Sequence, residues 1–207
     1  MNKVYDIFVI GGGINGCGIA RDASGRGYSV YLAEKNDISS GTSSASSKLI
    51  HGGLRYLENY EFLHVRKALK ERDTLISIAP HIIKETKFIL PYHKGLRPAW
   101  ILKFGMMLYD NLYSSKFIKR SRSINIKSHA SQETLLDSYS KGFEYSDCIA
   151  DDSRLTVLNA VDAKKLGAHI STRTIVNNIE QINNTWEIQT LDSVTGESHT
   201  IKAKVVI

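Results

Sequence analysis

Short apolar runs and amphipathic segments alternate at the start of the chain. The run at 5–10 is rich in β-formers and ends against three glycines, which is typical of a buried parallel strand. Residues 14–26 predict a helix, and Gly27 follows it as a residue suited to a left-handed helix end. A second strand-like run, 29–33, ends at Glu34. These segments together predict one βαβ unit.

Helical spacing returns in the middle of the chain. Apolar residues recur three to four positions apart over 60–79, where Pro80 marks the end. Residues 99–113 are apolar with few charges and predict a second helix. The stretch 114–127 is basic and rich in serine, which favours a surface loop. We therefore expect a helical and basic insertion over 59–142, after a βαβ unit and loop over 1–58.

The last part of the chain, 143–207, predicts a helix followed by a β-meander. Asp151 is a candidate cap for a helix that runs to about Leu166, before Gly167. Turn residues separate the four strand-like segments that follow, which are 169–174, 176–182, 186–191 and 200–207. The fold class predicted is α/β, a Rossmann-like domain with an inserted helical segment and a meander. Because the chain ends inside an apolar run, we expect it to be truncated at its C-terminus.

Composition adds a bias toward anionic partners. The 207 residues are 42% hydrophobic and 23% charged, as in ordinary soluble domains, and the formal net charge is +6. Phosphorylated substrates, nucleic acid and acidic lipid all fit that charge. Two cysteines, Cys17 and Cys148, suit a reducing cytosol and predict neither a disulfide framework nor a metal site. With no signal peptide and no membrane span in the pattern, a cytoplasmic location is expected.

A glycine motif sits between the first strand and the first helix. Gly11, Gly13 and Gly16 fit G-x-G-x-x-G, whose glycines permit a tight turn, close approach of a pyrophosphate and close helix packing. Glu34 ends the second strand, where a carboxylate can accept hydrogen bonds from a ribose. The same carboxylate would repel a 2′-phosphate, which argues against NADP. The motif itself does not separate NAD from FAD.

The segment after the second strand favours FAD. Residues 39–47 are rich in serine, and a flexible linker is the plain interpretation. Their place inside the opening fold, before Lys48-Leu49-Ile50-His51-Gly52-Gly53, instead favours a loop that contacts phosphate. NAD-binding domains usually continue with alternating strands and helices, so an NAD-binding module is the weaker alternative.

At this point the chain resembles the FAD-dependent glycerol-3-phosphate dehydrogenase family. The resemblance covers essentially the whole chain. It is carried by the flavin-loop segment 41–56, by Pro80-His81-Ile82-Ile83, Arg97-Pro98-Ala99-Trp100, Gly142-Phe143-Glu144-Tyr145-Ser146-Asp147-Cys148, Asp151-Asp152-Ser153-Arg154-Leu155 and Thr172-Arg173-Thr174. It implies a glutathione-reductase-like FAD-binding domain, with the family's substrate and C-terminal domains absent.

The resemblance also implies which residues hold the cofactor. Gly11, Gly13 and Gly16 would hold the FAD pyrophosphate, and Glu34 the adenosine ribose. The remaining implied FAD contacts are Thr42, Ser43 and Ser44 to the diphosphate or ribityl chain, Leu49, Ile50 and His51 along the isoalloxazine, and Val176 to the adenine through its backbone.

The implied reaction oxidises glycerol 3-phosphate to dihydroxyacetone phosphate and passes electrons to a membrane quinone. Arg55 and Tyr56 are the implied substrate contacts, because a guanidinium can grip a phosphate and a phenol can hydrogen-bond to substrate oxygens. Without the resemblance, an ion pair at the surface would be the preferred role for Arg55. The sequence assigns no catalytic base: His51 lies in the right loop, but a lone histidine is more often structural.

Two alternatives stay open at this stage, beside the NAD-binding module. A glycerol-3-phosphate oxidase shares the motifs and differs in passing electrons to oxygen. A truncated, non-catalytic remnant of the dehydrogenase would fit the abrupt C-terminus.

The stretch 94–127, with eight Lys or Arg and one acid, Asp110, carries aromatic and apolar residues. It could lie at an anionic membrane surface, on the inner face of the cytoplasmic membrane, or be a solvated basic loop. No nucleic-acid motif accompanies it, so we expect no nucleic-acid partner.

Overall fold

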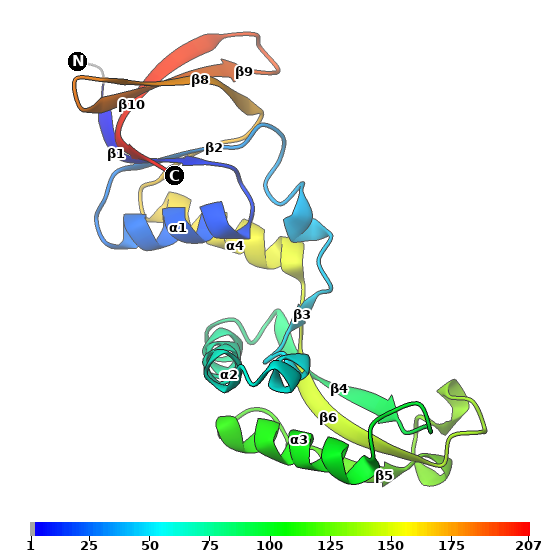
Figure 1. The fold of residues 1–207 in the computed structure, drawn as a ribbon. Coiled ribbons are helices and arrows are strands. Elements are labelled where there is room, and N and C mark those ends of the chain that lie inside the picture. Colours follow the sequence, from blue (N-terminus) through cyan, green and yellow to red (C-terminus); the bar gives the residue numbers. More distant parts are fainter. Residues whose placement is uncertain (1–2) are drawn as a thin grey trace. The chain divides into compact units, whose positions relative to one another are not determined.

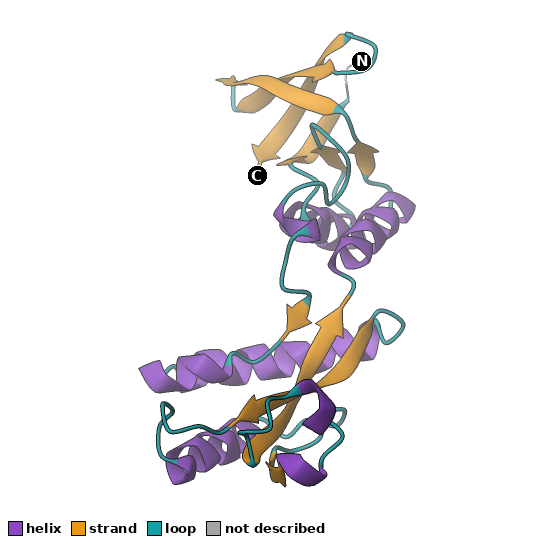
Figure 2. Ribbon diagram, turned by 90° about the vertical axis from the view of Figure 1, so that its right-hand side faces the viewer, coloured by secondary structure: helices purple, strands orange, loops and turns teal. Residues whose placement is uncertain are grey.

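The computed structural model describes residues 3–207, which form two compact units. Unit 1 contains the chain up to Ser47 and again from Asp151 to Ile207, and unit 2 is Lys48–Ala150. The chain therefore passes between the units twice, at 47–48 and at 150–151 (Figure 2). Each unit has its own sheet and its own helices.

Unit 1 is built on a six-stranded mixed sheet with the order β7-β2-β1-β10-β9-β8. Strands β7, β2, β1 and β10 run parallel to one another, and β10 continues through β9 to β8 as an antiparallel meander. The strand bounds are β1 Val4–Ile10, β2 Val30–Ala33, β7 His169–Ser171, β8 Thr174–Ile182, β9 Thr185–Asp192 and β10 Ser198–Val206. The predicted α/β fold with a parallel sheet and a β-meander is confirmed.

The two faces of this sheet bury alternate residues of the same strands. Helices α1 (Ile14–Gly25) and α4 (Asp152–Lys165) lie side by side on one face, over Val9 and Leu32 (Figure 1). Phe8 and Tyr31 point to the opposite face, where they pack with residues of the meander. Because side chains alternate along β1 and β2, one face of these strands packs on the helices and the other packs on residues of the meander strands β9 and β10.

The start of α4 and the end of the predicted strand 169–174 follow local rules. The Asp151 carboxylate accepts a hydrogen bond of 3.0 Å from the Arg154 N–H, so the predicted cap is confirmed. The strand prediction needs a correction, since β7 stops at Ser171 and a turn precedes β8. Arg173 has φ of 54° in that turn, and this left-handed conformation interrupts the strand.

Unit 2 carries a four-stranded antiparallel sheet, which the sequence did not predict. Strand β6 pairs with each of the other three strands. The elements are β3 Leu49–Ile50, the 3₁₀ helix Leu54–Asn59, α2 Phe62–Ile78, β4 Ile83–Pro91, α3 Ala99–Leu112, β5 Arg122–Asn125 and β6 Lys141–Ala150. Both predicted helices are present, but the insertion also contains the strands β4 and β5, and β5 lies in the stretch predicted to be a loop.

The sheet escaped prediction because its central strand buries polar residues. Glu144 and Asp147 of β6 are buried and paired, with Arg122 and Arg72 respectively. The Arg122 guanidinium and the His129 ring, hydrogen-bonded to Glu144, hold the pKa of that carboxyl below its ordinary range. A strand with buried charges does not show the apolar alternation that marks a half-buried strand.

No helix within residues 3–207 is long and apolar enough to cross a membrane.

The close packing of α1 on the glycine turn predicts that a side chain at Gly16 destabilises unit 1. A Cβ atom at Gly16 would overlap the carbonyl oxygen of Gly11, whereas a Cβ at Gly18 of the same helix would meet no atom within 4 Å. Gly16→Ala should lower the free energy of unfolding of unit 1 by at least about 2 kcal/mol, because the overlapped atom is backbone and cannot move aside cheaply. Chemical denaturation measured by circular dichroism checks this.

Gly18→Ala is the matched control for that variant. It adds the same methyl group to the same helix, and we expect stability to be unchanged or higher by up to about 1 kcal/mol, since alanine favours helix. Equal stabilities of the two variants would contradict the close approach at Gly16.

Candidate functional site

The glycine turn of unit 1 has the conformation that a bound pyrophosphate requires. Gly11 has φ of 106°, which L-residues rarely adopt, and Gly13 is the extended residue before α1. Gly16 lets α1 approach the strand end, as described above. Gly12 is a further requirement that the sequence reasoning missed: its Cβ would come within 3 Å of Glu34 and Ile38 side-chain atoms. The third consecutive glycine in the sequence was its signal.

Ser43 lies at the N-terminus of α1. Its hydroxyl oxygen accepts a hydrogen bond of 2.9 Å from the Ile14 N–H, the first amide of the helix. Thr42, Ser43 and Ser44 form one short 3₁₀ turn, and the Ser44 hydroxyl donates to the Gly41 carbonyl at 2.9 Å. The serine-rich loop is therefore folded against the positive end of a helix dipole, where phosphate oxygens bind favourably.

Glu34 connects the second strand to the glycine turn. One carboxylate oxygen accepts the Gly12 N–H at 2.7 Å, and the other accepts the Asn36 N–H at 2.7 Å. These bonds fix the carboxylate at the turn and use one lone pair of each oxygen, so further acceptor sites are available to ribose hydroxyls. The predicted role of Glu34 is compatible with this geometry.

Val176 lies on β8, and its side chain packs against the core that contains Phe8 and Tyr31. The pairing of β8 with β9 shifts register between Val176 and Asn178. A register shift of this kind leaves backbone groups outside the regular ladder. The predicted contact of the Val176 backbone with adenine stays a prediction.

The residues of unit 1 fit a dinucleotide on their own chemistry. Four features lie around the C-terminal ends of β1 and β2. They are the amide donors at the start of α1, a glycine turn without side chains, a hydroxylated loop and a fixed carboxylate. Cys17, beside this turn, is no nucleophile candidate, since burial and the Glu34 charge raise the pKa of its thiol to about 11. Within residues 3–207 no three His, Cys, Asp or Glu side chains gather as a metal site would require.

The other predicted site residues lie in unit 2, where most of them share one cavity. We call residues 49–56 the cavity segment. The cavity has a volume of about 550 Å³. Its lining consists of Leu49, His51, Gly53, Leu54, Arg55, Tyr56, Asn59, Phe88, Tyr145 and Asp147. Both predicted substrate residues and two of the three residues predicted to line the isoalloxazine are thus together.

Strand geometry explains which residues face this cavity. Leu49 and His51 are two positions apart and line it, whereas Ile50 between them does not. Ile50 pairs with Cys148 of β6. Of the predicted isoalloxazine contacts, Ile50 is therefore the one that the structure leaves outside the cavity.

Sequence reasoning missed the opposite wall of the cavity. Phe88 and Tyr145 stack with ring centroids 5.3 Å apart, and Asp147 lies two positions beyond Tyr145 on β6. Burial and the nearby Asp147 charge raise the pKa of Tyr145. Tyr145 and Asp147 stand in a motif that carried the family resemblance, but no role was assigned to either, because their common face appears only when β6 is recognised as a strand.

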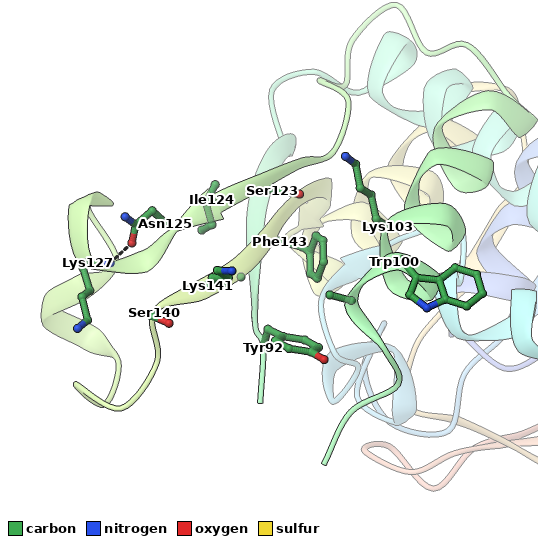
Figure 3. A pocket seen from close by; sticks show the side chains of 12 residues that line it. Tyr92, Trp100, Lys103, Ser123, Ile124, Asn125, Lys127, Ser140, Lys141 and Phe143 are labelled. Carbon is green, nitrogen blue, oxygen red and sulfur yellow. Dashed lines mark hydrogen bonds between the residues drawn. The ribbon is translucent and has the colours of Figure 1, made fainter. Parts of the chain in front are cut away.

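A second cavity, of about 530 Å³, contains none of the predicted site residues. Trp100 and Lys103 of α3, Tyr92 beyond β4, and Lys141 and Phe143 of β6 surround it (Figure 3). Along α3, Trp100, Phe104 and Met107 are 72%, 57% and 52% exposed. The predicted basic and aromatic stretch therefore has an exposed apolar face along α3.

Comparisons with known proteins agree with this geometry. The family model for FAD dependent oxidoreductases matches residues 6–207. Over 99% of its length, the chain is 52% identical to D-erythritol 1-phosphate dehydrogenase of Brucella abortus and 50% identical to glycerol-3-phosphate dehydrogenase of Pseudomonas tolaasii. It spans 41% and 39% of those proteins, about two fifths of their length.

A solved structure supports the fold and the cofactor. The glycerol-3-phosphate dehydrogenase from Bacillus halodurans, complexed with FAD, superimposes with a TM-score of 0.72 at 30% identity. The match covers 99% of this chain and 34% of that one. The predicted resemblance to glycerol-3-phosphate dehydrogenases and the prediction of FAD as cofactor are confirmed. This chain belongs to the FAD-dependent oxidoreductase family.

Proposed function

We propose that the protein oxidises sn-glycerol 3-phosphate to dihydroxyacetone phosphate, using FAD. The observation that carries the proposal is the cavity of unit 2, which gathers Arg55 and Tyr56 with Leu49 and His51. The similarity to dehydrogenases of polyol phosphates selects this substrate class. Because the chain spans about two fifths of those relatives, the activity is a property proposed for the whole protein.

The residues of the cavity would divide the work of binding. Arg55 would grip the phosphate, since its planar guanidinium presents paired N–H donors that match phosphate oxygens. Tyr56, whose ring meets that of His64 edge-on at 5.4 Å, would hydrogen-bond to substrate oxygens. The apolar wall of Phe88 and Tyr145 would limit access of water.

In unit 1, the amides at the start of α1 and the hydroxyl of Ser43 would hold the pyrophosphate, and Glu34 the ribose. Bound FAD would supply the redox chemistry by accepting the hydride from the substrate's secondary alcohol.

A second polyol phosphate deserves the same test. The relative that is 52% identical is a D-erythritol 1-phosphate dehydrogenase. The substrate that its name states is, like glycerol 3-phosphate, a polyol phosphate, so the roles proposed for Arg55 and Tyr56 would serve it equally. D-Erythritol 1-phosphate is therefore the second candidate.

We also propose that a membrane quinone takes the electrons and that the protein works at the inner face of the cytoplasmic membrane. The support is the apolar face of α3 with the basic neighbours Lys103 and Arg120. Aromatic and cationic side chains on one surface bind anionic lipid through apolar burial and charge together. A glycerol-3-phosphate oxidase is the alternative, and it would release hydrogen peroxide. A non-catalytic remnant would bind FAD without substrate oxidation.

The proposed function predicts a change in the flavin spectrum. The purified protein, loaded with FAD and kept anaerobic, should lose its flavin absorption on addition of glycerol 3-phosphate, because reduction bleaches the oxidised flavin. D-Erythritol 1-phosphate, added in parallel, ranks the two candidates by the rate of bleaching. Retained flavin that neither compound bleaches would contradict the proposed function, and peroxide formed in air would favour the oxidase.

Arg55→Ala sharpens that experiment. Loss of a charge-assisted bidentate contact should raise the substrate concentration for half-maximal bleaching on the order of 10- to 100-fold, while FAD remains bound. Arg66→Ala is the control, because Arg66 is an exposed arginine of α2 that does not line the cavity. Equal effects of the two variants would remove Arg55 from the substrate site.

The membrane proposal predicts binding to anionic vesicles. Replacing Trp100, Phe104 and Met107 with glutamate should lower the bound fraction on phosphatidylglycerol vesicles on the order of tenfold or more, since apolar burial is lost and like charge is added. Sedimentation with the vesicles measures it. Leu63→Glu is the control, because Leu63 is 74% exposed on α2, a different helix of the same unit. Unchanged binding of the triple variant would contradict the proposal.

A further inference from the structure

A chain of buried hydrogen bonds runs from the cavity segment into the core of unit 2. The Gly52 N–H donates to the Tyr109 hydroxyl oxygen at 2.9 Å. The Tyr109 oxygen lies 3.0 and 3.1 Å from the two carboxylate oxygens of Asp147. Arg72 donates to Asp147 at 2.5 Å. Arg72, Tyr109 and Asp147 are 3%, 3% and 4% exposed, so water does not compete for these bonds.

The direction of each bond in this chain is fixed. Burial, and the charge of Asp147, raise the pKa of Tyr109, so its hydroxyl keeps its proton. Asp147, paired with Arg72, can only accept. Tyr109 therefore donates to Asp147 and has its lone pairs free for the Gly52 N–H. Each donor polarises the next, and the low local dielectric strengthens the hydrogen bonds of this buried chain.

Packing confines Gly52 as tightly as the hydrogen bonds do. A Cβ at this position would lie 2.5 Å from the Tyr109 hydroxyl and would overlap the side chain of Leu69. Leu69 belongs to α2 and Tyr109 to α3, so two helices hold one peptide between them. Gly53 follows with φ of 75°, and this left-handed turn leads into the 3₁₀ helix that carries Arg55.

The confined peptide sits in the middle of the cavity segment. Leu49 and His51 line the cavity on its N-terminal side, and Arg55 and Tyr56 on its C-terminal side. Tyr109 itself does not line the cavity, and it reaches the segment through Gly52. We propose that Tyr109 is a positioning residue, which fixes the Gly52 peptide and thereby the placement of His51 and Arg55 toward flavin and substrate. The inference rests on the proposed function.

We call the hydrogen bond from the Gly52 N–H to the Tyr109 hydroxyl the tether. Tyr109→Phe tests the tether directly, and the test needs no cofactor. The ring that packs with Val65 and Leu69 is kept, and only the hydroxyl is removed. We expect exchange of the Gly52 amide hydrogen, followed by nuclear magnetic resonance, to be faster on the order of 10- to 100-fold, because a buried donor has lost its acceptor. Unchanged protection of Gly52 would overturn the proposal.

Tyr113→Phe is the matched control. Tyr113 packs against the same cluster, and within the described residues its side chain makes no hydrogen bond to the cavity segment. This variant should leave Gly52 exchange unchanged. Thermal unfolding of both variants separates loss of the tether from loss of the fold: a selective effect at Gly52, in a Tyr109→Phe protein whose melting temperature stays within a few degrees of wild type, supports the proposal.

A second measurement separates positioning from stability alone. In the flavin-loaded protein, Tyr109→Phe should change the shape of the flavin absorption bands and slow bleaching at saturating substrate on the order of tenfold, because small misplacements of binding groups cost rate. Tyr113→Phe should change neither. Faster Gly52 exchange with an unaltered flavin spectrum and rate would overturn the positioning role.

Failure of the proposed function would be distinguishable from failure of this inference. If wild-type flavin is not bleached by either polyol phosphate, the substrate assignment is wrong. The exchange of Gly52 and the shape of the flavin bands still decide whether Tyr109 positions the segment.

Discussion

The buried carboxylate of Asp147 organises unit 2. It is a charge placed on the central strand of the sheet, and burial of an unpaired charge would cost several kcal/mol, so the surroundings must supply partners. Arg72 comes from α2 and Tyr109 from α3, so satisfying this one group brings both helices to the sheet. Because only one arrangement of helices, strand and cavity segment supplies these partners, the buried charge favours that arrangement over others.

Unit 1 depends on a constraint of the opposite kind, which is the absence of atoms. At Gly16 the backbone of α1 lies so close to the Gly11 carbonyl that no side chain fits between them. This closeness brings the first amides of the helix beside the glycine turn, where Ser43 and Glu34 complete a set of donors and acceptors. A dinucleotide site of this kind needs little besides space, backbone polarity and one fixed carboxylate.

The sequence predicted unit 1 well because its signals are local. A strand, a glycine turn, a helix and a carboxylate follow one another within 34 residues, and each has a residue signature that tertiary context does not override. Unit 2 was predicted poorly because its signals are long-range. Strand β4 begins at Ile83 and its partner β6 at Lys141, and β6 buries Glu144 and Asp147, which a polar-outside pattern assigns to the surface. The pairing partners that make these residues strand-like are absent from the local sequence.

The same contrast explains which site residues were predictable. Arg55 and Tyr56 belong to the segment 41–56, which carried the family resemblance, and the structure shows them lining one cavity. The roles of Tyr109 and Arg72 could not be found this way, because each acts through a residue distant in sequence: Tyr109 lies 57 positions from Gly52, and Arg72 lies 75 from Asp147. Motif reasoning identifies groups that would touch a ligand, since these cluster in loops. The residues that hold such groups in place are distributed over helices and strands, and their function follows only from buried polar atoms and the partners that satisfy them.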